Sequence, residues 1–179
     1  IGVSGVIAEK TGNALERYNR ASARASRVLA LWREATGRTD PTLAAATASS
    51  PEAPERIRGV LRQQPEAQDL LDRFDQFCEE AFSIIPGAGD ALMTGDLGRL
   101  GELVDRSQRL AEQKLGNQVA QTAFLARSAR ALGAAAASAF GAGFGGSVWA
   151  LVPEAAVDDF LRRWEEAYRG AFPDVAGTF

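Results

Sequence analysis

The stretch GAGFGGSVWALV, residues 141–152, combines a glycine-rich loop with a run of apolar residues. Gly141, Gly143 and Gly146 have the spacing G-x-G-x-x-G, and the run SVWALV that follows is apolar almost throughout and contains two β-branched valines. Such a run is typical of a buried strand. The stretch therefore predicts a glycine loop that leads into a strand.

The segment before the loop, ALGAAAASAF at 131–140, carries conflicting signals. Alanine has the highest intrinsic helix propensity, so the local preference is helical. If the loop is a hairpin-like turn, the end of this segment must instead be a strand, and tertiary packing must override the propensity. We expect a turn between two adjacent strands, the first ending about Phe140 and the second beginning about Ser147. Glycine suits such a turn because it adopts positive φ and lets two backbones approach closely.

Two nucleotide-binding motifs share this glycine spacing, and the rest of the sequence disfavours both. A dinucleotide-binding turn runs from a strand into a helix, whose N-terminus receives the pyrophosphate, whereas this loop runs into a predicted strand. A protein-kinase glycine flap requires downstream His-Arg-Asp and Asp-Phe-Gly motifs, and the chain has no histidine. On spacing alone, a plain tight turn without a ligand stays open.

The composition of the 179 residues excludes further classes of protein. With 20 Lys and Arg against 23 Asp and Glu, the net charge is −3, which argues against a nucleic-acid or anionic-membrane surface. No apolar run reaches the ~20 residues of a membrane span. The single cysteine, Cys78, excludes an internal disulfide and favours a reducing compartment. Because histidine is absent and cysteine is single, a metal site with the usual zinc ligands is not expected.

Apolar periodicity makes most of the remaining chain helical. The β-branched stretch 1–10 predicts a strand, 38–54 with its three prolines predicts a surface loop, and PGAGD at 86–90 predicts a turn. The expected helices cover 13–36, 66–85, 95–110, about 117–132 with Asn117 as N-cap, and the segment from Pro153 onward. Together these elements predict a mostly helical α+β fold, organised as one domain over residues 1–179.

The segment ASAFGAGFGGSVWALV resembles the third conserved motif of the GHMP kinase superfamily, most closely its galactokinase branch. Three other segments agree in order and spacing. GDLGRLGELVDRSQ at 95–108 resembles a helix of the family that contains the residues GDL. RFDQFCEE at 73–80 resembles a family segment whose arginine and glutamate correspond to Arg73 and Glu80. Tyr18 resembles the tyrosine that begins a long helix in the family. The resemblance implies a GHMP-kinase C-terminal domain, α+β and predominantly helical, in which several helices cover a small antiparallel, ferredoxin-like sheet.

The resemblance also implies a function. The chain would be the C-terminal half of an ATP-dependent, galactokinase-like sugar kinase of the cytoplasm, which phosphorylates a hexose or hexose derivative at the anomeric hydroxyl. In this family the N-terminal half carries the phosphate loop and the catalytic carboxylate. We therefore expect a fragment without catalytic residues, whose partners are the sugar, ATP with Mg²⁺ bound mainly by the N-terminal half, and that half itself. The alternative is a kinase-derived module that senses sugar and nucleotide without turnover.

The site residues that the resemblance implies in this chain are few. Tyr18 is expected to hydrogen-bond a sugar hydroxyl, although its place in the apolar stripe of its helix also suits packing. The glycine loop is expected to line the active site, either by contact with a phosphate or hydroxyl or by supporting the phosphate loop of the N-terminal half, and we favour support. The loop comprises Gly141, Ala142, Gly143, Phe144, Gly145 and Gly146.

Other polar residues separate this chain from typical galactokinases. Gln76 and Gln108 stand where that branch commonly carries histidine, so the identity of the sugar stays open among galactose relatives, uronic acids and other hexose derivatives. Arg73 and Glu80 are expected to be solvated surface charges, and Cys78 an inert thiol on an apolar helix face.

Overall fold

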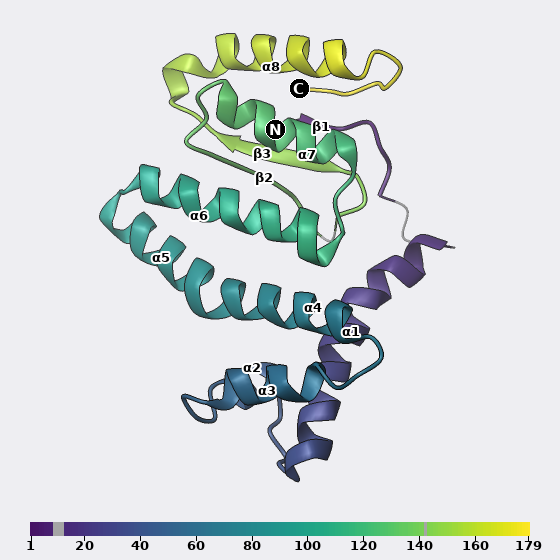
Figure 1. Ribbon diagram of the computed structural model, residues 1–179. Coiled ribbons are helices and arrows are strands. Elements are labelled where there is room, and N and C mark those ends of the chain that lie inside the picture. The colour runs from purple at the N-terminus through teal and green to yellow at the C-terminus, as the bar shows by residue number, and fades with distance from the viewer. Residues whose placement is uncertain (9–12, 142) are drawn as a thin grey trace.

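The computed structural model describes residues 1–8, 13–141 and 143–179, with the backbone alone for 13–18. The fold is mostly helical α+β with a small three-stranded antiparallel sheet (Figure 1). The strands are β1 (Gly2–Val3), β2 (Ala136–Ala139) and β3 (Ser147–Leu151), in the order β1-β3-β2. An isolated antiparallel bridge between Val3 and Thr178 adds the C-terminal segment on the far side of β1. The predicted fold class is confirmed.

Helices α7 (Ala120–Ala131) and α8 (Val157–Ala171) pack with the sheet around one hydrophobic core. Trp164 of α8 is its centre: the side chain is fully buried, and its indole Nε1 donates to the carbonyl oxygen of Leu125 on α7 at 3.1 Å. Helix α6 (Leu97–Leu110) runs beside β2 (Figure 1). The buried residues of this core are Leu125, Ala126, Ala129, Ala134, Ala137, Val148, Phe160, Trp164 and Tyr168.

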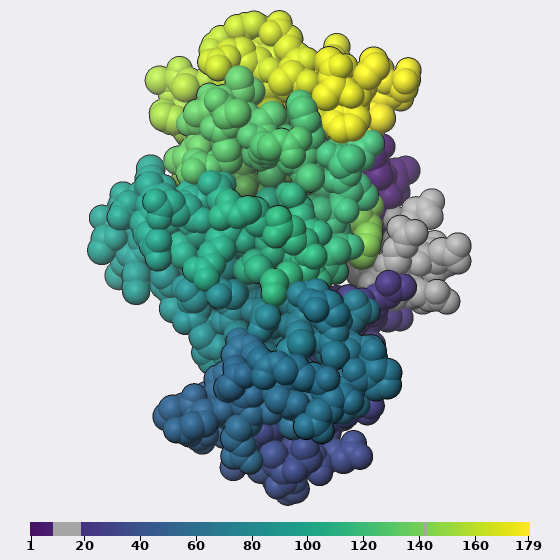
Figure 2. Space-filling view, viewed as in Figure 1, coloured from purple at the N-terminus to yellow at the C-terminus, as the bar shows by residue number. Residues whose placement is uncertain are grey.

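A second hydrophobic core lies among the N-terminal helices. It is formed by α1 (Asn13–Thr36), α2 (Leu43–Thr47), α3 (Ala53–Leu61) and α4 (Ala67–Glu79). Trp32 is buried in it, and its Nε1 donates to Asp40 Oδ2 at 2.9 Å. These helices form the lower end of an elongated body, of which α8 forms the upper end (Figure 2).

The predicted turn at 86–90 is wrong. These residues belong to α5 (Ile85–Thr94), which follows α4 through a π-helical turn at Glu80–Ile84. Pro86 stands in the first turn of α5, where a missing backbone N–H costs little. Gly87 stays helical because α6 packs closely against it: a Cβ there would lie 3.2 Å from Leu103 Cδ1. Helix packing therefore overrides two residues that usually punctuate structure.

Three other boundaries differ from the sequence prediction. Of the strand expected over 1–10, the described residues 1–8 form only Gly2–Val3, and the surface loop expected at 38–54 contains α2 and the start of α3. Helix α7 begins after Val119, not after Asn117, because the Thr122 side chain accepts a hydrogen bond from the Val119 backbone N–H at 3.3 Å. The remaining short elements are a π-helical turn at Ala111–Leu115 and a 3₁₀ turn at Glu154–Ala156.

Candidate functional site

The glycine loop joins two neighbouring strands. Residues 136–139 pair antiparallel with 148–151, and the Phe140 backbone N–H donates to the Ser147 carbonyl oxygen at 2.9 Å. The loop is therefore a hairpin connection, as predicted, and the alanine run before it ends as a strand in spite of its helix propensity. Because no helix starts at Gly146, the dinucleotide-binding interpretation is excluded.

Two distant segments of the chain hold this loop from either side. The Phe144 N–H donates to the Asn117 carbonyl oxygen at 2.5 Å, and the Gly146 N–H donates to the Val6 carbonyl oxygen at 2.9 Å. Both contacts depend on glycine. A Cβ on Gly143 would lie 1.9 Å from the Asn117 oxygen, and a Cβ on Gly145 would lie 2.5 Å from the Val6 oxygen.

The backbone of the loop is strained at one further position. The glycines at 141, 143, 145 and 146 all have positive φ, which costs glycine little. Phe144 has φ 62°, and it is the one non-glycine residue with positive φ in the described part of the chain. A left-handed conformation costs such a residue about 1–2 kcal/mol, and strain of this kind is concentrated at ligand sites. The hydrogen bond from Phe144 to Asn117 helps to hold it.

Phe144 lines a cavity of about 330 Å³, which we call the basic cavity. Its walls come from α1, from the segment 114–119 before α7, and from the glycine loop. Arg20, Arg24 and Lys114 supply its charged lining, and none of the residues that line it is acidic. The start of α1, the segment before α7 and the loop lie near one another on one side of the molecule (Figure 1).

Carboxylates of helix α4 form ion pairs with two of these cationic side chains. Arg24 forms an ion pair with Asp69, and Lys114 Nζ lies 3.2 Å from Asp75 Oδ2 and 3.3 Å from Asp72 Oδ1. Burial opposes the charge on Lys114, but the two carboxylates outweigh it and raise the pKa of the ammonium group. The ion pairs hold both side chains in place, and the raised pKa keeps the Lys114 ammonium group charged at neutral pH.

The segment with Arg73 and Glu80 has a structural role. The prediction that these are solvated surface charges is wrong, because both are half-buried. Arg73 donates to the Ala21 carbonyl oxygen at 3.1 Å and to Gln76 Oε1 at 2.6 Å. Burial lowers the pKa of this guanidinium. Glu80 accepts from Ser107 Oγ at 2.6 Å. Arg73 ties α4 to α1 just behind the basic cavity, and Glu80 ties the π-helical turn to α6.

Gln108, at a position where histidine is common in galactokinases, supports β2. Its Oε1 accepts from Ser138 Oγ and from the Ala139 N–H, both at 3.0 Å, and its Nε2 donates to Glu112 at 2.9 Å. Gln108 is buried, and its partners Ser138 and Glu112 are half-buried. Only Phe140 separates Ala139 from the first residue of the glycine loop, so Gln108 positions the start of the loop.

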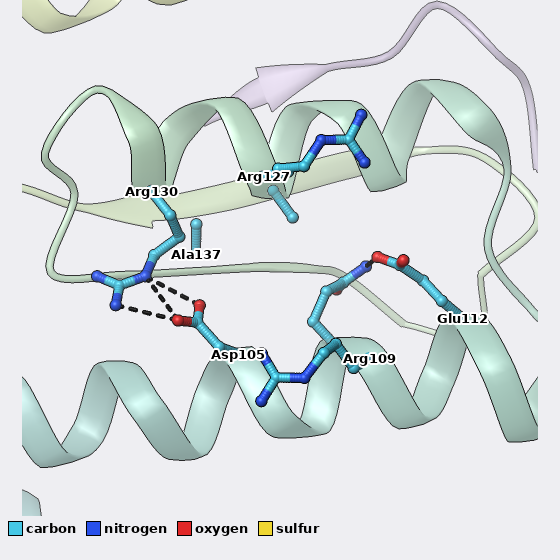
Figure 3. Close-up of a pocket in the computed structure, with 8 residues that line it drawn as sticks. Asp105, Arg109, Glu112, Arg127, Arg130 and Ala137 are labelled. Carbon is cyan, nitrogen blue, oxygen red and sulfur yellow. Dashed lines mark hydrogen bonds and ion pairs between the residues drawn. The ribbon is translucent and has the colours of Figure 1, made fainter.

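A second tether holds the other end of β2. Figure 3 shows Asp105 of α6 and Arg130 of α7 pointing toward one another beside Ala137. Arg130 Nε lies 2.9 Å from Asp105 Oδ1, and its NH1 donates to the carbonyl oxygens of Ala134 and Ala135. Asp105, Arg130 and Ala137 are among the residues that line a cavity of about 250 Å³. The sequence does not predict these hydrogen bonds and ion pairs, because the residues that they join are brought together only by the packing of α6 and α7 against β2.

Two predicted site residues lie outside the described part. The backbone of Tyr18 belongs to α1, but its side chain is outside the described residues, and so is Ala142. Their roles stay predictions. In the described residues no group of three or more acidic, cysteine or histidine side chains could hold a metal ion. Among the same residues, no helix combines the length and apolarity needed to cross a bilayer.

Residues 87–170 match the protein family described as GHMP kinases C terminal. This segment is a GHMP kinase C-terminal domain. It contains α6, α7, β2, the glycine loop, β3 and nearly all of α8. The segment that first indicated the superfamily in the sequence, 137–152, thus lies inside the matched region.

The whole chain is also similar to a solved structure. The crystal structure of Lactococcus lactis galactokinase complexed with galactose matches 99% of this chain with a TM-score of 0.77 and 21% sequence identity. The chain spans 43% of the length of that galactokinase. No curated protein matches the chain by sequence. The similarity therefore extends the fold beyond the matched domain to the N-terminal helices.

Proposed function

We propose that this chain is the C-terminal part of an ATP-dependent sugar kinase that phosphorylates a hexose or hexose derivative at its anomeric hydroxyl. The observation that carries the proposal is the match of almost the whole chain to the fold of a galactokinase. The sugar, ATP with Mg²⁺ and the N-terminal half of the same kinase would be its partners. A protein of this kind would work in the cytoplasm.

The glycine loop would serve this reaction mainly as a rigid support. Phosphoryl transfer depends on positioning and electrostatic stabilisation more than on reactive side chains, so a wall of fixed shape is what a partner domain requires. Two of the loop's amides, those of Phe144 and Gly146, already bond within the chain. Because these two amides already donate within the chain, they favour a loop that supports a neighbouring phosphate loop, and they disfavour direct contact with the transferred phosphoryl group.

The test is an assay of the complete protein encoded by the full reading frame. ADP release would be followed with ATP, Mg²⁺ and a panel of hexoses, hexuronic acids and amino sugars, and ³¹P NMR would locate the phosphate on the product. We expect turnover with at least one sugar and a phosphate on the anomeric oxygen. Absence of transfer to every sugar, or a phosphate on the primary hydroxyl, would contradict the proposal.

A further inference from the structure

The basic cavity has an imbalance of charge that the proposed sugar chemistry leaves unexplained. Arg20, Arg24 and Arg27 follow one another at four- and three-residue spacing and so share one face of α1. In the described side chains, ion pairs join Arg24 to Asp69 and Arg27 to Glu66, whereas Arg20 has no carboxylate within ion-pair distance. Arg20 is exposed and lines the cavity. Among the described side chains, no ion pair neutralises its charge.

The rest of the cavity reinforces this positive potential. The carboxylates that pair with Arg24 and Lys114 belong to α4 and are not among the lining residues. The opposite wall contains Gln118 and Val119, directly before the first residue of α7. The N-terminal end of a helix carries a partial positive charge and favours anions. The cationic side chains and the helix dipole therefore both make the electrostatic potential in the basic cavity more positive.

We infer that the basic cavity binds an oxyanion, a phosphate or a carboxylate, with Arg20 as the main contact. A neutral hexose offers hydroxyls alone and needs no such concentration of cations. An arginine bonds the paired oxygens of phosphate or carboxylate in a bidentate geometry. A cavity of about 330 Å³ is at the lower end of the size of small-molecule sites, which suits one anionic group with part of its carrier. Only the source of that group, nucleotide phosphate or acidic sugar, rests on the proposed function.

The direct test uses the chain itself with inorganic phosphate as probe. Phosphate would replace chloride at constant ionic strength and pH, and the Arg20 Nε–Hε resonance would be followed by NMR. We expect saturable binding, weakened about tenfold in Arg20→Gln because a charge-assisted hydrogen bond is lost. Arg27→Gln is the matched control: it removes the same charge seven residues along α1, at a side chain outside the lining, and should leave the binding constant within about twofold.

Two results would overturn the inference. One is a phosphate titration without saturation; the other is an equal loss of affinity in Arg20→Gln and Arg27→Gln, which would show a general charge effect. Arg20 is exposed, so its replacement leaves the folded state intact for the measurement. Because this titration needs no turnover, it separates failure of the inference from failure of the kinase proposal.

Kinetics of the complete protein would then identify the source of the anion. If the nucleotide supplies it, Arg20→Gln raises the KM for ATP about tenfold and leaves the KM for sugar unchanged. If the sugar supplies it, the native protein prefers a hexuronic acid to the parent hexose, and Arg20→Gln removes that preference. Either pattern supports the inference, and unchanged values of both KM constants would contradict it.

Discussion

Gly143 touches the backbone of Asn117 so closely that a Cβ on the glycine would lie 1.9 Å from the asparagine carbonyl oxygen. This contact joins the β2–β3 hairpin to the segment before α7. Gly145 makes the corresponding approach to Val6, on the other side of the loop. The glycine spacing therefore reflects two close backbone contacts within the chain, which keep the loop in one shape next to the basic cavity.

Replacement of Gly143 should cost much more stability than replacement of Gly141. Both glycines have positive φ, but no atom lies within 4 Å of a Cβ placed on Gly141. Gly141→Ala should lose about 1 kcal/mol of unfolding free energy from its left-handed backbone. Gly143→Ala should lose about 3 kcal/mol, since the clash adds to that strain. Urea denaturation of the two variants measures the difference, and equal losses would contradict the assigned contact.

Removal of the Gln108 side chain should loosen the strand that leads into the glycine loop. Gln108→Ala leaves the Ala139 N–H and the Ser138 hydroxyl without their acceptor, at a cost of about 1–3 kcal/mol. Amide hydrogen exchange at Ala139 should quicken in this variant. Gln113→Ala, at an exposed glutamine one helical turn beyond, is the control and should change stability by less than about 0.5 kcal/mol. Unchanged exchange at Ala139 would count against the tether.

Cys78 should react slowly with alkylating reagents in the folded chain. Burial raises the pKa of its thiol to about 11, above the ordinary value of about 8.5. A raised pKa keeps the thiol protonated, so at pH 8 the thiolate fraction is roughly 200-fold smaller than for a free cysteine. In the folded chain, the alkylation rate should increase with pH until about pH 11. In urea, the midpoint of this pH dependence should fall to the ordinary pKa of a cysteine. A midpoint near pH 8.5 in the folded chain would disprove this.

Loss of the Tyr18 hydroxyl should weaken sugar binding in the complete protein. If this hydroxyl bonds a sugar hydroxyl, as the family resemblance implies, Tyr18→Phe should raise the KM for sugar about three- to tenfold with little change in the KM for ATP. The other tyrosine is the control. Tyr168 donates to the Ser4 carbonyl oxygen inside the core, so Tyr168→Phe should lower the melting temperature and leave the KM for sugar unchanged. The opposite pattern would assign Tyr18 a packing role.

The chain by itself should not phosphorylate sugars. It spans 43% of the galactokinase that it resembles, and phosphoryl transfer needs a phosphate cradle and metal ions placed around the reacting oxygens. The purified chain, incubated with ATP, Mg²⁺ and the sugar panel, should release ADP no faster than the buffer blank. The complete protein assayed in parallel is the positive control, and turnover by the chain alone would place catalytic residues within it.

Local signals were sufficient for the elements with strong periodicity or apolar character. Helix α1 covers 13–36 as predicted and ends before Gly37, which has the positive φ expected of a helix stop. The run at 147–151 is a strand, and the glycine loop is a hairpin connection. The sequence was misleading at 86–90, where a proline and two glycines lie within helix α5 and Gly87 packs against Leu103.

Local patterns were enough to predict the fold class and to indicate the family that residues 87–170 match, because both predictions depend on short stretches such as the glycine loop and the apolar run after it. Tertiary structure alone decided what surrounds the loop. Asn117 and Val6 are distant from it in sequence, and only the folded chain brings their carbonyl oxygens against Gly143 and Gly145. It likewise gathers Arg20, Lys114 and Phe144 around one cavity, since side-chain proximity there depends on helix packing, which no local pattern encodes.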